Sequence, residues 1–317
     1  MTSTVAAGSA GRRLDQWLAA RFTYRDLDGW HAEIDDGNIL VNDEAGAAAR
    51  VLAAGDRVEY QPPARPEPPV ATDYTVVHED DGLLVINKPP DLPCHPGGRY
   101  FRHTLWALLR EAYDDVRLIN RIDRETSGLV LVGRNRRTAG KIGKQFERRQ
   151  VEKEYLCVVE GAFPPEAHAH GLLVQAHDGP VLKKQRYVPE AECDADLDGD
   201  ACDTRFQRLA AGGGLSLVNC RPRTGRLHQI RVTLHSLGFP VVGDKIYGVD
   251  DGAYVRFIDS TITADDWRRL RLSHQALHAW KLRCRLPDDE LHEFVAPLPA
   301  DVRDLLRAAG LPTPANA

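Results

Sequence analysis

The sequence lacks the features of a membrane or secreted protein. No apolar run approaches the roughly 18–20 residues that a bilayer-spanning helix needs, and the first ten residues contain no basic stretch followed by an apolar one. We therefore expect a cytoplasmic protein with no membrane contact. None of the six cysteines forms a Cys-x-x-Cys pair. This spacing favours reduced thiols over a zinc site or a disulfide framework.

Several common catalytic motifs are also missing. There is no glycine-rich nucleotide loop followed by Lys and Ser or Thr, and no Gly-x-Ser-x-Gly elbow. His274 and His278 lie four residues apart without an acidic third ligand nearby, so we expect them to pack in the core. Asp194–Asp200 matches the front half of a calcium loop, but Arg205 stands where the bidentate Glu is required. That segment is predicted to be an acidic surface loop. Because these motifs are missing, the chemistry has to come from a carboxylate.

Charge is unevenly distributed along the chain. The formal net charge is -5, which argues mildly against a nucleic-acid partner. Residues 134–153, however, contain eight basic residues and two acidic ones, a local net of +6. Much of this stretch is predicted to be helical, with Ile142 and Phe146 facing inward. A basic helix is commonly a solvated surface, but one this one-sided in an acidic protein favours contact with phosphates.

The pattern of elements predicts two domains. A tail up to about residue 10 is expected to be disordered. Residues 1–61 then contain two helices, Arg12–Phe22 and Asp26–Asp36, and two strands, Ile39–Val41 and Arg57–Tyr60. A proline-rich stretch at 62–72 predicts a stiff linker. Residues 73–317 form the second predicted domain.

The first domain resembles the small α-L RNA-binding domain of ribosomal-protein-S-four type. The matching pieces are Arg13-Leu14-Asp15, Gly37-Asn38-Ile39-Leu40-Val41-Asn42 and Ala54-Gly55-Asp56-Arg57-Val58. Residues 1–70, however, contain seven Arg, no Lys and eleven acidic residues, a net of -4. A domain that binds RNA and a domain that packs or docks a partner both remain open.

The stretch Asn120–Gly133 carries the strongest functional signal. Asp123 lies between Arg121 and Arg124, just before the apolar strand Leu129–Val132. A carboxylate beside a guanidinium stays ionised at neutral pH and can act as a nucleophile. On these residues alone, a structural Asp–Arg pair is the alternative.

The same stretch resembles the catalytic motif of the RluA-like pseudouridine synthases, usually His-Arg-Leu-Asp-x-x-Thr-Ser-Gly. Further pieces follow in the family's order: Glu79 to Pro89 with its Lys-Pro loop, Lys153-Glu154-Tyr155, Thr224 to Arg231 and Gly243 to Gly248. The resemblance covers about residues 74–297. It implies an α+β fold, with a mixed, largely antiparallel sheet, flanking helices and a central cleft.

The resemblance also implies roles for individual residues. Asp123 matches the nucleophile, Tyr155 the tyrosine that packs on the uracil, and Arg231 the arginine paired with the aspartate. Arg121 matches an arginine that can fill the space left by a flipped base. Asn120 departs from the family, which usually has His there.

The expected partner is structured RNA, ribosomal or transfer, and the expected reaction isomerises uridine to pseudouridine without cofactor or metal. A monomer is expected. The residues predicted to contact RNA are Arg121, Lys88, Arg148, Arg149, Lys153, Arg226 and His228.

Two other functions compete with this one. A non-catalytic RNA-binding or ribosome-assembly protein could share the fold, although intact Asp123, Tyr155 and Arg231 argue against it. A carboxylate-based nucleosidase or glycosidase would need a second carboxylate, for which Glu125 is the near candidate.

Overall fold

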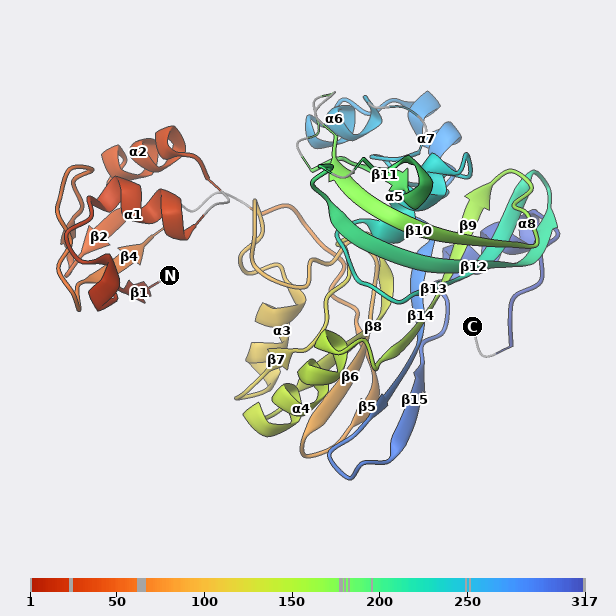
Figure 1. Cartoon of the computed structure of the whole chain (residues 1–317), viewed down its shortest axis with the longest axis horizontal. Coiled ribbons are helices and arrows are strands. Elements are labelled where there is room, and N and C mark those ends of the chain that lie inside the picture. The colour runs from red at the N-terminus through yellow and green to blue at the C-terminus, as the bar shows by residue number, and fades with distance from the viewer. Residues whose placement is uncertain are drawn as a thin grey trace. The chain divides into compact units, whose positions relative to one another are not determined.

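The computed structural model describes residues 2–22, 25–61, 67–176, 179, 181, 183–194, 196–248, 250 and 252–315. The chain divides into two compact units (Figure 1). The N-terminal unit is Met1–Pro68 with Gly97–Phe101, and the C-terminal unit is Pro69–Pro96 with Arg102–Ala317. The division after Pro68 falls inside the predicted linker, of which residues 62–66 lie outside the described residues.

The N-terminal unit packs two helices on a small antiparallel sheet. Its strands occur in the order β1-β4-β2-β3. Their bounds, with those of the helices, are β1 Thr2–Thr4, η1 Ala7–Ser9, α1 Leu14–Arg21, α2 Leu27–Asp35, β2 Ile39–Val41, β3 Glu44–Ala45 and β4 Arg57–Tyr60. The core contains Trp17, Trp30 and Ile39, so the unit has its own hydrophobic centre. The predicted helices and strands are all present.

The predicted disordered tail is wrong. Thr2–Thr4 pairs with Arg57–Glu59 as an edge strand, and Val5 is buried, with its amide donating to the carbonyl of Asp56 at 2.9 Å. Strand pairing uses backbone groups, so the small polar side chains of this segment gave no sign of it.

Part of the acidic charge of this unit is structural. Asp15 is buried and accepts from Arg13 at 2.7 Å and from Gln16 N at 2.7 Å, with His31 at 3.0 Å. Glu33 is also buried and pairs with Arg25 at 2.9 Å. These two carboxylates are therefore not available to repel a phosphate directly.

The C-terminal unit is built on one large sheet. Over the described residues it has 11 strands, in the order β11-β10-β12-β13-β9-β14-β8-β6-β5, with β15 beside β14 and β7 beside β8. The strands are β5 Thr75–Glu79, β6 Leu83–Lys88, β7 Arg117–Leu118, β8 Ser127–Gly133, β9 Glu152–Glu160, β10 Glu166–Gln175, β11 Gln185–Pro189, β12 Asp200–Gly212, β13 Leu215–Pro222, β14 Leu277–Arg285 and β15 Leu291–Val295. Among these pairings only β8 with β14 is parallel. The prediction of a mixed, largely antiparallel sheet is confirmed.

Helices cover the sheet on different faces (Figure 1). They are α3 Leu105–Ala112, α4 Arg136–Glu147, α5 Gln229–Ser236, α6 Ala253–Ile258, α7 Ala264–Leu270 and α8 Ala300–Ala308, with the short 3-10 turn η2 Glu190–Glu192. Ile142 of α4 is buried and Phe146 packs on the same core, as predicted. No helix in the described part of the chain is long and apolar enough to cross a membrane.

Strand β8 lies at the rigid centre of this unit. Its residues are all buried. Leu129 and Leu131 pack with Ile142 of α4, whereas Val130 and Val132 pack with Leu109 of α3. Because both faces are covered, the loop that enters β8 is held on an immobile base.

Candidate active site

Glycine at the start of β8 fixes where the preceding loop lies. Gly128 has φ +109°, and a Cβ there would lie 2.3 Å from the carbonyl oxygen of Ala279 in β14. Only glycine therefore permits the close parallel pairing of β8 with β14 at this point. This explains why glycine follows Ser127 in the stretch after Asp123.

A buried histidine anchors the same corner. His278 has Nε2 3.0 Å from the carbonyl oxygen of Ala296, so this nitrogen carries the proton. Its Nδ1 then accepts from Ser127 Oγ at 2.9 Å. Burial lowers the pKa of His278 to about 4, so the ring is neutral. The structure thus confirms that His278 packs in the core.

Asp123, Arg231 and Asp244 form a continuous ionic chain. Arg231 Nη1 donates to Asp123 Oδ2 at 2.7 Å. The same guanidinium donates through Nε and Nη2 to Asp244 at 2.6 and 2.9 Å. Asp244 is fully buried and also accepts from the amides of Ile246 and Tyr247. The bidentate contact fixes the plane of Arg231, which in turn orients Asp123.

This chain keeps Asp123 ionised. Burial raises the pKa of Asp123, but the charge of Arg231 outweighs it, with smaller help from His228, and the pKa lies below its usual value. For Asp244, burial is likewise outweighed by Arg231, and its pKa is about 2. Since Arg231 carries one positive charge and holds two carboxylates, the group as a whole is anionic at neutral pH.

Asp123 opens into a cleft, and 28% of its side chain is exposed. The charged and polar lining residues are Arg121, Asp123, Thr126, Lys153, Tyr155, Thr224, Arg226, His228, Gln229 and Arg231. Asp123 is the one carboxylate among the described lining residues. Tyr155 lies on β9, and burial followed by the charge of Asp123 raises the pKa of its phenol. Tyr155 is therefore a neutral aromatic beside an anion.

His228 is held at the start of α5 in a left-handed conformation, with φ 56°. Its Nδ1 lies 3.0 Å from the hydroxyl of Tyr247. Burial and the charge of Arg231 lower the pKa of His228 to about 4. The imidazole is neutral at physiological pH, so it can contact RNA through a hydrogen bond but not through charge.

Comparison with known proteins identifies the family of this chain. Residues 82–236 match the model of a family described as RNA pseudouridylate synthase. A relative from Nitrosomonas europaea, ribosomal large subunit pseudouridine synthase D, is 30% identical; the match covers 96% of this chain and 86% of that protein. The chain belongs to the RNA pseudouridylate synthase family.

Other members of the family match more locally. The mitochondrial tRNA pseudouridine(32) synthase of Saccharomyces cerevisiae is 35% identical over 76% of this chain, which spans only 51% of that protein. The solved structure of human RNA pseudouridylate synthase domain containing 4 covers 75% of this chain and 94% of its own, at 25% identity and a TM-score of 0.56. The family fold predicted from the sequence is confirmed.

Lys88, one of the residues predicted to contact RNA, does not reach the protein surface. Lys88 is fully buried, and its Nζ donates to the carbonyl oxygens of Pro89 at 2.7 Å and Arg124 at 3.0 Å. The prediction that Lys88 contacts RNA is therefore wrong, because no RNA atom can reach the ammonium. Burial lowers its pKa to about 8. Lys88 instead ties the end of β6 to the loop that carries Asp123.

The other predicted RNA contacts fall into two groups. Arg121 and Arg226 are exposed and line the cleft, together with the half-buried Lys153 and His228. Lys153 Nζ donates to Thr224 O at 2.8 Å, and burial with the nearby charge of Arg149 lowers its pKa to about 8. Arg148 and Arg149 lie outside the cleft lining, exposed where α4 ends. The first group can contact a nucleotide in the cleft, whereas the second can contact only more distant RNA.

The sequence did not single out Asp244 or Lys245, although both lie in the recognised motif Gly243 to Gly248. Lys245 Nζ is buried and pairs with Glu125 at 2.8 Å. It also lies 4.6 Å from the ring centre of Phe257 in α6 and 5.7 Å from that of Trp267 in α7. Two helices inserted after this motif therefore support the loop of Asp123. Because α6 and α7 lie far from Asp123 in the sequence, their support of this loop could not be predicted.

Glu125 does not provide the second carboxylate of a glycosidase. Its two oxygens accept from Arg124 at 2.8 Å and from Lys245 at 2.8 Å. It does not line the cleft. A glycosidase needs a free acid and a free base on either side of the sugar, and among the described residues of the cleft lining Asp123 is the one carboxylate.

Asn120, the departure from the family motif, has a structural role. Its Oδ1 accepts from Leu131 N at 2.7 Å and its Nδ2 donates to Leu129 O at 3.3 Å. The carboxamide thus pairs with β8 as a backbone peptide would. Asn120 is not among the described residues that line the cleft.

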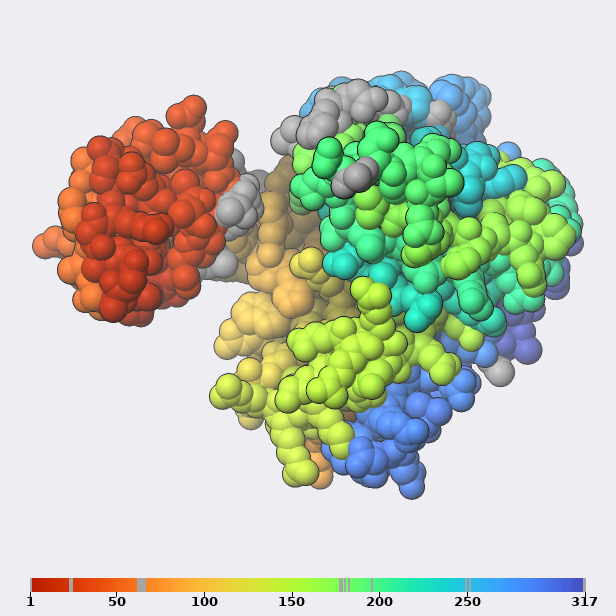
Figure 2. All heavy atoms as spheres, viewed as in Figure 1, coloured from red at the N-terminus to blue at the C-terminus, as the bar shows by residue number. Residues whose placement is uncertain are grey.

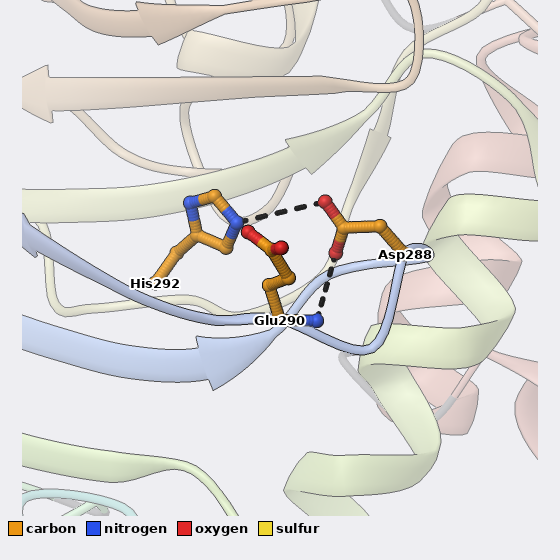
Figure 3. Close-up of side chains that lie close together, drawn as sticks. All are labelled: Asp288, Glu290 and His292. Atoms are coloured by element: carbon orange, nitrogen blue, oxygen red, sulfur yellow. Dashed lines mark hydrogen bonds and ion pairs between the residues drawn. The ribbon is translucent and has the colours of Figure 1, made fainter.

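Among the described residues, one group of potential metal ligands occurs, and none of its members lines the cleft (Figure 3). Asp288, Glu290 and His292 come from the hairpin between β14 and β15, and their ligand atoms lie within 4.8 Å of one another. Both carboxylates are exposed. Within the described residues, no such group forms at the calcium-like segment Asp194–Asp200, from which residue 195 is excluded.

Proposed function

We propose that this chain is an RNA pseudouridine synthase in which Asp123 is the nucleophile. The observation that carries the proposal is the ionised Asp123, oriented by the Arg231–Asp244 pair in a cleft that it shares with Tyr155. The names of family relatives refer to transfer RNA and to the large ribosomal subunit. Uridine in structured RNA of either kind is the proposed substrate.

The reaction requires the uridine to leave the helical stack. In this proposal Arg121 occupies the vacated space, and Arg226 and Lys153 bind the flanking phosphates; all three line the cleft. Tyr155 supplies a flat, neutral surface for the uracil. The cleft therefore binds the extruded nucleotide by stacking and charge.

The chemistry then follows from one carboxylate. Asp123 attacks the ribose C1′ or the uracil C6, and the bond between N1 and C1′ breaks. The uracil turns, and C5 bonds to C1′ while the bond from Asp123 to C1′ or C6 breaks, which regenerates the carboxylate. The proton on C5 leaves and N1 gains a proton, so the product is an isomer of the substrate. No net oxidation, reduction or hydrolysis occurs, so the reaction consumes no cofactor. Arg231 holds Asp123 charged and aligned before the attack.

The decisive variant is Asp123→Asn. The amide keeps the shape of the side chain but is a much weaker nucleophile, so pseudouridine formation should fall to background while RNA affinity stays within about threefold. Transfer and ribosomal RNA from cells lacking the gene would be the substrate, with products measured by nucleoside chromatography. Asp115→Asn, at an exposed carboxylate paired with Arg117, is the control. Retained turnover in Asp123→Asn would rule out the nucleophile, and no turnover in the intact chain would favour a non-catalytic RNA-binding protein.

A further inference from the structure

A second cavity, of about 550 Å³, lies on the other face of the sheet from Asp123. It is lined by side chains from β10, β12 and β13: Glu166, His168, Arg205, Gln207, Asn219 and Arg221. Tyr155 and Cys220 are paired across β9 and β13 and face the core beneath the cleft. Because side chains alternate along a strand, Asn219 and Arg221 face the opposite way. We call this the outer-face cavity.

Its floor contains an unsatisfied polar atom. Asn219 is 3% exposed, and its Nδ2 donates to Glu154 Oε2 at 2.6 Å, which fixes the orientation of the amide. Asn219 Oδ1 is buried and has no hydrogen-bond partner within the described part of the chain. Because this oxygen is enclosed, a ligand in the cavity would instead meet the exposed side chains of Glu166 and Gln207 beside it.

Cross-strand pairing sorts the lining into two rows. His168, Arg205 and Arg221 face one another across the three strands and form a basic row. Glu166, Gln207 and Asn219 form the next row, which offers carbonyl, carboxylate and amide groups. Residues two apart on a strand are separated by about 6.7 Å. The cavity therefore presents cations on one side and hydrogen-bonding groups a few ångströms away.

The basic row has an uncompensated charge. Arg205 and Arg221 are exposed and directly opposite each other, an arrangement that destabilises a sheet unless an anion lies between them. Arg221 has Glu154 at 3.4 Å, and His168 Nε2 lies 2.9 Å from Asp203 Oδ1. Arg205 has no ion pair in the described ranges of the chain. A phosphate bridging the two guanidinium groups would relieve the repulsion.

We propose that the outer-face cavity binds one unpaired nucleotide of the RNA substrate, beyond the modified uridine. The phosphate lies between Arg205 and Arg221, and a base N–H donates to the exposed carboxylate of Glu166 in the next row. This inference rests on the proposed function. The strand end of β13 separates the two sites, since Pro222 lines the cleft and Arg221 lines the outer-face cavity. β10 and β12 run across the front of this unit in Figure 1 and reach the surface in Figure 2.

Binding of a fluorescein-labelled 12-nucleotide oligouridylate, followed by anisotropy at several salt concentrations, tests the phosphate contact. Arg205→Gln should weaken binding about tenfold and reduce the slope of log affinity against log salt by about 0.7, the value for one phosphate on a single strand. Arg117→Gln, at an exposed arginine of β7 paired with Asp115, is the matched control. Because Arg205→Gln removes a like-charge contact, its melting temperature should stay the same or rise. Unchanged affinity and slope would overturn the proposal.

A second experiment locates the base. The same oligonucleotide with 4-thiouridine should crosslink to peptides that contain Glu166 or Gln207, and less so in Glu166→Ala. Crosslinks confined to the cleft would overturn the proposal. Uridine 5′-monophosphate titrated calorimetrically should bind far more weakly than the oligonucleotide; equal, Arg205-dependent affinity would mean a free-nucleotide site and would overturn the assignment to RNA.

Measurements of turnover distinguish a failure of this proposal from a failure of the proposed function. With structured RNA, Arg205→Gln should raise KM several-fold and leave kcat unchanged. If the intact chain forms no pseudouridine but Arg205→Gln still weakens RNA binding, the proposed function fails and the outer-face cavity stands. If turnover is normal and binding is insensitive to Arg205, only the outer-face cavity fails.

Discussion

Arg231 decides the charge state of Asp123. A carboxylate as enclosed as Asp123 would have a raised pKa, and the guanidinium 2.7 Å away reverses this. Asp244 keeps Arg231 in place from the other side. A nucleophile of this kind is active only when ionised, so activity should be lost as the pH falls through the pKa of Asp123.

Arg231→Gln tests this dependence. Without the positive charge of Arg231, the effect of burial on Asp123 is no longer outweighed and its pKa rises, so the acidic limb of the kcat/KM profile should move to higher pH. We also expect kcat to fall by about 10²–10³, as for the loss of an oriented charged contact. Arg223→Gln, at an exposed arginine that does not line the cleft, is the control. A profile that keeps its acidic limb in place would show that Arg231 does not set the ionisation of Asp123.

Asn120 should affect stability rather than RNA binding. Asn120→Leu removes two hydrogen bonds to β8 and leaves the amide of Leu131 unpaired, at a cost of about 1–3 kcal/mol. The melting temperature should fall by several degrees, while affinity for RNA stays constant. Asn120→His, the usual family residue, should be close to the natural chain because imidazole also offers one donor and one acceptor. Weakened RNA binding by a stable Asn120→Leu would contradict the structural role.

The family motifs identified individual site residues that residue spacing alone did not. Asp123 and Arg231 are 108 positions apart, and nothing in their local sequence shows that they meet; family resemblance supplied that pairing. Lys88 is a residue for which the motif led to a wrong prediction. A lysine in a Pro-rich loop is ordinarily exposed, and its burial depends on the carbonyl groups of Pro89 and of the distant Arg124. Such contacts cannot be deduced from one sequence.

At the level of elements, α4 presents a basic end to solvent. Its buried side is formed by Thr138 and Ile142, whereas Arg148 and Arg149 follow its C-terminal end and are exposed. Periodicity sufficed to predict this helix, since its apolar residues lie on one face. The order of strands in the sheet could not be predicted from periodicity, because β14, near the end of the chain, lies between β9 and β8.

Reversing the charge at the end of α4 should weaken RNA binding in a salt-dependent way. Arg148→Glu with Arg149→Glu should lower affinity for structured RNA by tenfold or more at low salt, with a shallower salt dependence, since phosphate contacts are lost. Filter binding between 50 and 300 mM salt would measure this. Reversal of Arg117 together with Arg307, exposed arginines paired with Asp115 and Asp304, changes the net charge by the same amount and is the control. Equal losses in both variants would indicate a general charge effect and move the RNA-contacting surface away from α4.

At the scale of the whole molecule, each unit has its own core. Trp17, Trp30 and Ile39 centre the N-terminal unit, and Val70 already packs on the core of the C-terminal unit together with Tyr74. The proline-rich composition predicted a boundary near this point. It could not predict that Gly97–Phe101 would group with the N-terminal unit, a grouping that includes a 2.9 Å hydrogen bond from Phe101 N to Glu67.

A chain that begins at Pro69 should therefore fold without the N-terminal unit. It keeps Val70 and the whole large sheet, so we expect a soluble protein with a cooperative thermal transition close to that of the C-terminal unit in the full chain. If the N-terminal unit binds RNA, affinity should fall while kcat at saturating RNA is retained; if it only packs or docks a partner, affinity should be unchanged. Deleting through residue 74 instead should cost stability, because Val70 and Tyr74 are lost from the core. An insoluble chain from Pro69 would show that the two units do not fold independently.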